Sequence, residues 1–407
     1  MLLLPFLFTA IGFVQLSLLN GFRWEYSAAL AVWTLSFAAA DVLLHRRLPR
    51  TDPHLLPLTA LLTGWGLVLI ARLAPNFLLR QTVWLAVSTG ALLAVALTPR
   101  MVTWLRRYKY TWLIAGLTLL TATLVFGVNP SGAGARLWLG VGGVYFQPSE
   151  PLKILLVVFL AGYLSDSRRQ MIDLSAKIGN LPLPHPAYFG PMLLMWGFSV
   201  LLLFWQRDLG AALLFFTVFL LMLYTAIGQL RYLLVGGGLL LLVGALGARL
   251  FDYVALRVQA WWNPWLDPAG RSFQIVQSLL AFASGGFFGQ GLGQGLPTAI
   301  PVVHTDFVFA AIGEEYGALG ALGVLLALGV MVWLAFQIAL AGQTHFRQLL
   351  AVGLGSLLGG QTLLIAAGTL KLIPLTGVTL PFVSYGGSSL LTGFIMVGLL
   401  LNLSCET

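Results

Sequence analysis

The sequence predicts an all-α protein that crosses a membrane many times. Hydrophobic residues make up 59% of its 407 residues and charged residues only 9%, whereas a soluble domain carries roughly 25% charged residues. The apolar residues gather in long runs, and short loops hold most of the charge. Runs of about 20 apolar residues have the length of a membrane-spanning helix, and helices satisfy their own backbone hydrogen bonds inside a bilayer.

Twelve apolar segments are expected to be spans. The first is long enough to be a membrane helix itself, so we do not expect a cleaved signal peptide. The run 307–340 exceeds the length of one span, so it should either begin outside the bilayer or tilt within it. The expected spans are 1–19, 24–45, 54–73, 79–98, 110–127, 150–165, 187–205, 209–227, 230–250, 307–340, 345–369 and 387–405.

Lysine and arginine residues predict how these spans are oriented. Twelve of them fall in one set of loops and nine in the other, or seven when the long loop 251–306 is set aside. Long loops are set aside because they cross the membrane largely regardless of their charge. The more basic loops should face the cytoplasm, which places both termini there. The segments 128–149, 206–208 and 370–388 then lie with the long loop on the outer side.

Composition also argues against several function classes. The net charge of +9 is spread over short loops, which indicates membrane orientation and not nucleic-acid binding. The sequence contains no Walker motif, so we do not expect ATP to be used. The single cysteine, Cys405, cannot form an internal disulfide, and no Cys/His cluster has metal-ligand spacing.

The first candidate residues lie at the start of the span 150–165. Glu150 and Lys153 are three residues apart, which puts them on one face of a helix and close enough to pair. Ser149 suits a helix cap, and Pro151 suits the first turn. The pair could fix helix packing, or Lys153 could receive an anionic lipid head group while Glu150 orients it.

A polar turn separates the spans 187–205 and 209–227. It contains Arg207 and Asp208, and Asp208 suits the N-cap of the following helix. The functional alternative places both residues in the wall of a cavity on the outer side.

The long outer loop 251–306 has an interfacial character. Residues 272–283 alternate at helical spacing, which suggests a helix lying in the membrane interface, and nearby tryptophans suit the same depth. The glycine run 285–295 allows the backbone to approach a ligand closely or to act as a hinge. Because no strand is expected before it, a dinucleotide site is not expected. A flexible loop with interfacial anchors is the simpler interpretation.

Acidic residues stand where this loop meets the next apolar run. Asp306 follows His304 and Thr305, and Glu314 and Glu315 lie inside the apolar run itself. Because carboxylates at the membrane boundary are costly, their presence suggests a functional site. Asp306 could also serve as a helix N-cap, which would not exclude a catalytic role.

The segment 374–389 is the last candidate. Its two prolines and three glycines interrupt any continuous helix, and such backbone occurs at membrane depth where it lines a cavity. The final two serines could instead cap the last helix. The residues expected to contribute to the site are Ser384, Tyr385, Gly386, Gly387, Ser388 and Ser389.

These segments, in this order, resemble the SEDS family of bacterial cell-wall glycosyltransferases, which is typified by RodA and FtsW. The resemblance covers residues 54–405 and is carried by Gln-Pro-Ser-Glu-x-x-Lys, the Asp-Leu-Gly turn, the glycine loop, His-Thr-Asp-Phe with Gly-Glu-Glu, and Pro-Phe-Val-Ser-Tyr-Gly-Gly-Ser-Ser. It implies a ten-helix core over residues 51–407 with the extracytoplasmic loop 251–306. Residues 1–50 would form two additional N-terminal transmembrane helices.

The resemblance also implies an activity and partners. The family polymerises lipid II into glycan strands for cell elongation or division, and Asp306 matches its essential aspartate. Glu150 and Lys153 match the polar pair of its outer cavity. Family members usually work in the cytoplasmic membrane with a class B penicillin-binding protein, a transpeptidase that cross-links the growing strands.

Three positions depart from the family pattern. Arg136 stands in Arg-Leu-Trp where Arg-Arg-Trp is usual, Pro151 replaces a small or aliphatic residue, and Arg207 replaces a frequent proline. These departures concern substrate binding and remove no catalytic group.

For the reaction that the resemblance implies, a single displacement would invert the configuration of the anomeric carbon. Asp306 would remove the proton from the acceptor 4-hydroxyl, and such a general base typically contributes ~10²–10⁴-fold. Lys153 and Arg136, and more weakly Arg207, would stabilise the departing pyrophosphate. A divalent cation such as Mg²⁺ or Mn²⁺ could share this role, although the sequence contains no dedicated metal cage.

A flippase or transporter for lipid-linked oligosaccharides is the competing hypothesis. It shares the polytopic fold and explains buried charges, but transporters often contain internal repeats, and no convincing repeat is found here. A scaffold for division or elongation partners is a third hypothesis, and it leaves Asp306 unexplained.

Overall fold

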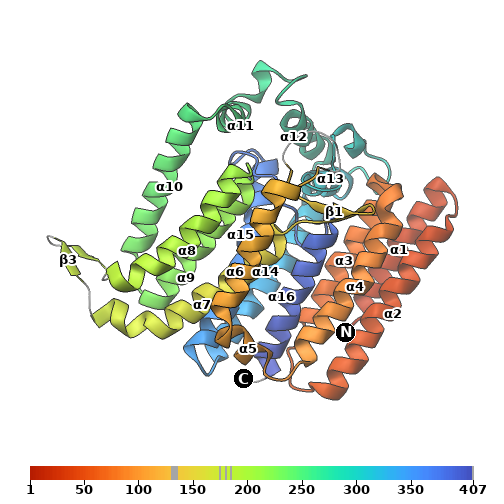
Figure 1. Ribbon diagram of the computed structural model, residues 1–407. Coiled ribbons are helices and arrows are strands. Elements are labelled where there is room, and N and C mark those ends of the chain that lie inside the picture. The colour runs from red at the N-terminus through yellow and green to blue at the C-terminus, as the bar shows by residue number, and fades with distance from the viewer. Residues whose placement is uncertain (130–135, 174–175, 179–180, 184–185, 406–407) are drawn as a thin grey trace. The chain divides into compact units, whose positions relative to one another are not determined.

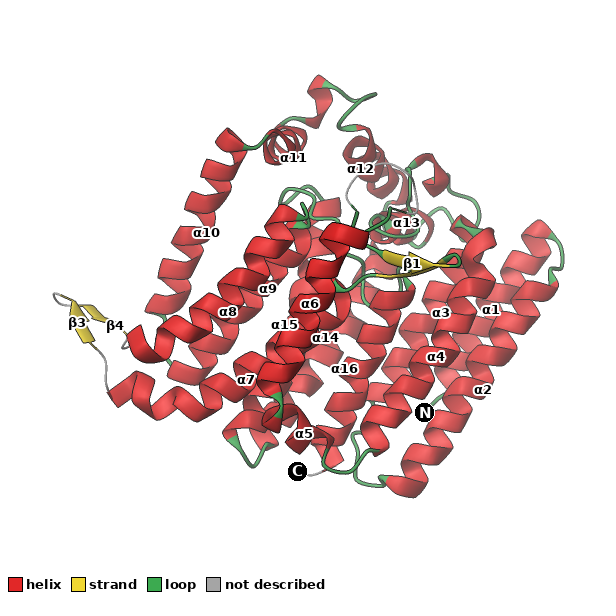
Figure 2. Cartoon of the chain, viewed as in Figure 1, coloured by secondary structure: helices red, strands yellow, loops and turns green. Residues whose placement is uncertain are grey.

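The computed structural model describes residues 1–129, 136–173, 176–178, 181–183 and 186–405. Figures 1 and 2 show that these residues are mainly helical, with connecting loops and two short hairpins. The helices are α1 (Leu3–Asn20), α2 (Trp24–Arg47), α3 (Leu55–Leu73), α4 (Leu78–Leu97), α5 (Met101–Arg107), α6 (Lys109–Phe126), α7 (Ser149–Asp173), α8 (Pro186–Trp205), α9 (Leu209–Ile227), α10 (Arg231–Leu250), α11 (Asp252–Trp262), α12 (Phe273–Gly285), α13 (Val308–Glu315), α14 (Gly317–Ala341), α15 (His345–Thr369) and α16 (Gly387–Cys405). The 3-10 helices are η1 (Pro75–Phe77), η2 (Pro264–Leu266) and η3 (Pro297–Ala299), and the antiparallel hairpins are β1 (Leu139–Val141) with β2 (Val144–Phe146) and β3 (Ala176–Ile178) with β4 (Leu181–Leu183).

The predicted all-α polytopic fold class is confirmed. In the described part of the chain, ten helices are long and apolar enough to cross a membrane. The other two expected spans coincide with α7 and α8, which are helical without belonging to these ten. Three charged residues fall in the first 18 residues of α7, and within α8 the stretch Gly190–Trp205 counts as a shorter apolar helix.

The expected span 307–340 is two helices and not one. The short helix α13 ends at Glu315, and α14 begins at Gly317, whose φ of +68° lies in the left-handed region. Glycine adopts this conformation without strain, and a Cβ atom at this position would lie 2.7 Å from the carbonyl carbon of Phe287. The excess length of the segment therefore lies in α13, which precedes the spanning helix α14.

Replacing Gly317 with alanine should destabilise the protein by roughly 2–4 kcal/mol, because it adds left-handed strain and a clash with backbone. The thermal unfolding midpoint of the detergent-solubilised protein, measured at one scan rate, would report the loss. Gly329 is the matched control, since it lies in the same helix with no atom within 4 Å of an added Cβ. Equal midpoints for Gly317→Ala and Gly329→Ala would contradict the interpretation.

The chain divides into two compact units, and α10, α14, α15 and α16 contribute residues to both. The first unit comprises Met1–Leu97, Leu241–Leu334 and Gln361–Leu401, and the second comprises Thr98–Leu240, Ala335–Gly360 and Asn402–Thr407.

In the first unit, the two N-terminal helices pack directly on the helices that follow them. Helix α1 packs against α3, and α2 packs against α4. An added Cβ on Gly12 would lie 2.8 Å from the side chain of Val68, so the absence of a side chain permits close approach of α1 and α3. On α2, Trp33 and Phe37 are fully buried, and Phe37 contacts the ring of Phe394.

In the second unit, α7 is the central helix and packs against α6, α8 and α9. Its residues Leu152, Val158 and Leu160 are completely buried. Gly116 of α6 faces Leu152, where an added Cβ would lie 2.8 Å from the leucine side chain. This packing places the polar start of α7 in a largely dry environment.

Candidate active site

Two segments of the first unit, 304–306 and 380–386, are joined by hydrogen bonds. The backbone N–H of Tyr385 donates to the carbonyl oxygen of His304 at 2.8 Å, and the Ser384 hydroxyl donates to that of Thr305 at 2.6 Å. Two motifs that lie far apart in the sequence therefore meet, and four of the predicted site residues take part in the junction.

An aromatic cluster covers this junction. The ring of Phe77, from η1, stacks on Tyr385 with centroids 4.7 Å apart and on His304 with centroids 5.3 Å apart. Burial lowers the pKa of His304 below its ordinary value, so its ring is neutral at pH 7. Phe77 was not predicted from the sequence, because nothing local distinguishes it from other apolar residues near a span end.

Asp306 lies half-buried at the end of the first segment. Phe307 holds the N-cap position of α13, so Asp306 precedes the cap and the N-cap interpretation is wrong. The backbone of Gly377, at a φ of +74°, passes close to the carboxylate, and a Cβ there would lie 3.6 Å from Oδ2 of Asp306. Asp306 is thus flanked by the non-helical segment that the sequence marked as a cavity wall.

Polar side chains support the interrupted segment 374–389. The Gln361 amide donates to the carbonyl oxygen of Thr379 at 2.8 Å, and the Thr379 hydroxyl contacts that of Ser389 at 2.8 Å. Gln81 accepts from the backbone N–H of Gly386 at 3.3 Å. These bonds satisfy backbone groups that no helix satisfies, as a membrane interior requires.

The predicted capping of the last helix by Ser388 or Ser389 is wrong, because the helix begins before both residues. Helix α16 starts at Gly387, so Ser388 and Ser389 lie in its first turn. An added Cβ at Gly387 would collide with the indole of Trp84. Among the residues predicted here, Gly386 contributes its backbone N–H, and Gly387 allows close approach of Trp84 because it has no side chain. The hydroxyl of Ser389 forms a hydrogen bond with that of Thr379 in the same segment.

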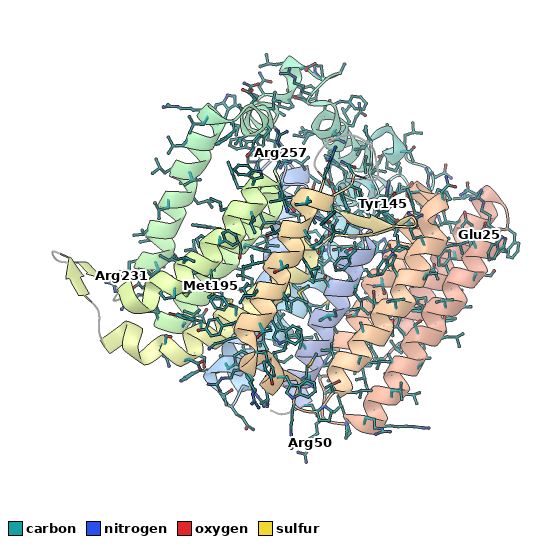
Figure 3. The ribbon with its side chains drawn as sticks, viewed as in Figure 1. Glu25, Arg50, Tyr145, Met195, Arg231 and Arg257 are labelled. Carbon is teal, nitrogen blue, oxygen red and sulfur yellow. The ribbon has the colours of Figure 1, made fainter. Side chains whose placement is uncertain are left out.

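The predicted interfacial helix corresponds to α12, and α11 precedes it in the same loop. Arg257, labelled in Figure 3, extends from α11 and lies 3.4 Å from the carbonyl oxygens of both Leu375 and Thr376. The indole N–H of Trp261 donates to the carbonyl oxygen of Lys371 at 3.1 Å. The long loop is therefore attached to the segment beside Asp306.

Glu314 and Glu315 hold the glycine run in place. Glu314 accepts from the N–H of Leu296 at 2.8 Å, and Glu315 accepts from the N–H of Gly293 at 3.1 Å. Glu315 also forms an ion pair of 3.1 Å with Arg72. Both glutamates are buried and hold the loop in position; their contact with substrate stays a prediction.

A second polar cluster lies in the second unit at the start of α7. Lys153 donates to Glu150 at 2.6 Å, and both residues are buried, which confirms the predicted pair. The Ser149 hydroxyl donates to Asp208 at 3.3 Å. Asp208 accepts from the N–H of Ala211 at 3.1 Å and is the N-cap of α9, as predicted.

Burial raises the pKa of Asp208, which lies just before the spanning helix α9, while the charge of Lys153 opposes the rise. Arg207, beside it, is exposed and adopts a left-handed φ of +63°, a conformation that is uncommon for residues other than glycine. Arg136 is exposed and precedes the β1–β2 hairpin. The second unit thus presents two exposed arginines and one buried lysine from the predicted site.

Among the residues that the structure describes, no group of three or more His, Cys, Asp or Glu side chains is arranged to hold a metal ion.

These features define a polytopic membrane protein. Its first unit contains a half-buried carboxylate beside an interrupted helical segment, and its second unit contains a buried lysine–glutamate pair. The profile of a family described as "Cell cycle protein", comprising FtsW, RodA and SpoVE, matches residues 55–407. The chain belongs to this family.

Individual relatives are similar over most of the chain. Peptidoglycan glycosyltransferase RodA of Mycobacterium tuberculosis is 37% identical over 412 residues, which cover 98% of this chain and 87% of that protein. Probable peptidoglycan glycosyltransferase FtsW of Geobacter sulfurreducens is 34% identical over 372 residues, covering 88% and 96%. The mycobacterial match extends into the first 50 residues, which lie outside the family profile.

Solved structures share the fold. A chain from a structure described as a peptidoglycan synthase complex that coordinates polymerization and crosslinking has a TM-score of 0.71 and 31% identity, covering 87% of this chain and 97% of its own. The crystal structure of the rod shape determining protein RodA of Thermus thermophilus has a TM-score of 0.62 and 29% identity, covering 87% and 96%.

Proposed function

We propose that the protein is a peptidoglycan glycosyltransferase that polymerises lipid II into glycan strands. Its family, and relatives with that printed activity over most of the chain, support this reaction. The observation that carries the chemistry is Asp306, a half-buried carboxylate between a hydrogen-bonded loop junction and the close backbone of Gly377.

In the proposed reaction, Asp306 is the general base. The acceptor 4-hydroxyl oxygen forms a bond to the anomeric carbon of the donor, the bond from that carbon to pyrophosphate breaks, and the hydroxyl proton passes to Asp306. A base within hydrogen-bond reach contributes ~10²–10⁴-fold. Attack from the face opposite the pyrophosphate inverts the anomeric configuration.

The departing pyrophosphate needs positive charge, and we assign that role to Lys153 with Arg136 and Arg207. A preorganised cation in a dry site stabilises developing negative charge more than it would in water. Lys153 fits because it is buried and is held by Glu150. The described residues include no group of three or more His, Cys, Asp or Glu side chains suited to hold a divalent cation such as Mg²⁺ or Mn²⁺, so we assign no step of the reaction to such an ion.

We propose that this chemistry occurs on the outer face of the cytoplasmic membrane, with both termini in the cytoplasm. The excess of basic residues in the opposite loops supports this orientation. A Cys405→Ser background makes it testable, because Cys405 is the only cysteine. A membrane-impermeant maleimide added to intact cells should label Val302→Cys but not Arg107→Cys; the reverse pattern would overturn the orientation.

We propose a class B penicillin-binding protein as partner. The similarity to a chain of a synthase complex that coordinates polymerization and crosslinking supports such a partner. Co-purification from cells expressing a tagged full-length chain would test it.

The decisive test of the function uses purified protein and labelled lipid II. The proposed enzyme makes glycan polymer in detergent, where there is no second compartment. A flippase would move labelled lipid II across liposomes and make no polymer, and a scaffold would do neither. Absence of polymer under conditions in which a related RodA is active would exclude the proposal.

A further inference from the structure

The second unit contains a polar cavity at the far end of α7 from Lys153. Its volume is about 560 Å³, and every side chain that lines it is polar or charged. The walls come from α5, the C-terminal half of α7 and the start of α15. A cavity of this size suits a small ligand or a lipid head group. We call it the basic pocket, and Arg106, Asp166, Arg168, Thr344, His345 and Gln348 are its main residues.

Positive charge is in excess in the basic pocket. Its one acid, Asp166, is shared by two cations, Arg106 at 2.8 Å and Lys109. Arg168 donates to the carbonyl oxygen of Ala226 at 2.8 Å and to no carboxylate within the described chain. Among the described residues, the basic pocket and the adjoining Lys109 thus contain three cations and one carboxylate, and a half-buried guanidinium that has no described carboxylate partner favours an anion beside it.

The side chains of the basic pocket are held in place before any ligand arrives. Arg168 contacts Nε2 of His345 at 3.2 Å, and Nδ1 of that ring lies 3.2 Å from the Gln348 side-chain oxygen. The Gln348 amide donates to the carbonyl oxygen of Gly342 at 2.9 Å. In the consistent assignment, Nδ1 carries the proton and Nε2 accepts from Arg168. Preorganised donors lose little freedom on binding.

We propose that the basic pocket binds a phosphate-bearing anion. The guanidinium fork matches the oxygens of phosphate, the Thr344 hydroxyl lies in the same wall, and Arg106 keeps 47% of its side chain exposed. The phosphate would belong to the head group of an anionic lipid or to a soluble compound. Capping of α9 by Arg168 at Ala226 explains one contact, but it explains neither the run of polar and charged residues in the lining nor the second arginine.

The basic pocket is separate from the Glu150–Lys153 pair. Arg168 lies 15 positions after Lys153 in α7, which corresponds to about 22 Å along a helix. In the orientation proposed above, the pocket opens to the cytoplasm, so its ligand differs from the substrate of the polymerase. Binding to it can be measured without any glycan synthesis.

The test compares neighbouring arginines in the full-length protein in detergent. Saturable binding is followed by intrinsic tryptophan fluorescence with two probes, short-chain phosphatidylglycerol and inorganic phosphate, and phosphatidylcholine serves as the uncharged-head-group control. Arg106→Gln and Arg168→Gln should each weaken binding roughly tenfold, as expected for the loss of a charge-assisted contact. Arg107→Gln, which removes the same charge from an exposed residue outside the lining, should leave binding unchanged.

The outcomes distinguish the sources of the phosphate. Binding of both probes supports recognition of the phosphate group itself, and binding of phosphatidylglycerol alone supports a lipid head group. Saturable binding of neither probe overturns the proposal, as does an Arg107→Gln effect equal to that of Arg106→Gln. If Arg168→Gln does not fold, the comparison between Arg106→Gln and Arg107→Gln still decides.

Discussion

Purified Asp306→Asn protein is expected to insert and fold normally but to lose lipid II polymerisation by roughly 10²–10⁴-fold. Asparagine keeps the size of the side chain and can still form hydrogen bonds, but it cannot accept the proton of the acceptor hydroxyl. Phe307, not Asp306, holds the N-cap of α13, so the substitution leaves the cap residue of that helix unchanged. The rate of formation of labelled glycan polymer is the measurement.

Asp252 provides the control for this substitution. It is an exposed aspartate in the same unit and the same outer loop, so Asp252→Asn should polymerise lipid II at the wild-type rate. A thermal unfolding midpoint for Asp306→Asn near that of the wild type would show that the fold survives. Undiminished polymer formation by Asp306→Asn would remove Asp306 from the reaction.

The local sequence pattern was sufficient to predict where the helices lie and which side chains interact within a single helix. All twelve expected spans fall on helices because apolar length is a local property. The Glu150–Lys153 pair and the Asp208 cap were predicted for the same reason, since spacing along one helix determines both contacts. The break before Gly317 was missed, because a strong apolar run conceals one left-handed residue.

Contacts between distant segments account for what the sequence did not reveal. Glu314 and Glu315 were predicted to bind substrate, and the sequence did not reveal that they also accept hydrogen bonds from the backbone N–H groups of Leu296 and Gly293. Glu315 is in addition paired with Arg72. Arg72, near the C-terminal end of α3, was not predicted to take part. A buried carboxylate requires a partner, so an arginine at the end of an apolar helix was the available signal. Gln361, a polar residue inside an apolar span, gave a similar signal.

Lys153→Met is expected to lower both stability and activity, and a double substitution separates the two effects. The single variant leaves buried Glu150 without its cation, which costs roughly 3–5 kcal/mol. The double variant Glu150→Gln with Lys153→Met removes both charges and should recover most of this loss, because paired removal of buried charges is often close to neutral. Thermal unfolding midpoints at one scan rate would measure the recovery.

Activity of the double variant then decides between packing and substrate binding. If Lys153 stabilises the departing pyrophosphate, the double variant, although folded, should polymerise lipid II at least about a hundredfold more slowly than the wild type. This is the effect expected for the loss of one oxyanion-stabilising group. Lys109→Met is the matched control, since it breaks another lysine–carboxylate pair of the same unit, with Asp166, and should keep its activity per folded molecule. Wild-type activity in the double variant would mean that the Glu150–Lys153 pair serves helix packing alone. A stable protein without the lysine charge would then still release pyrophosphate at the normal rate.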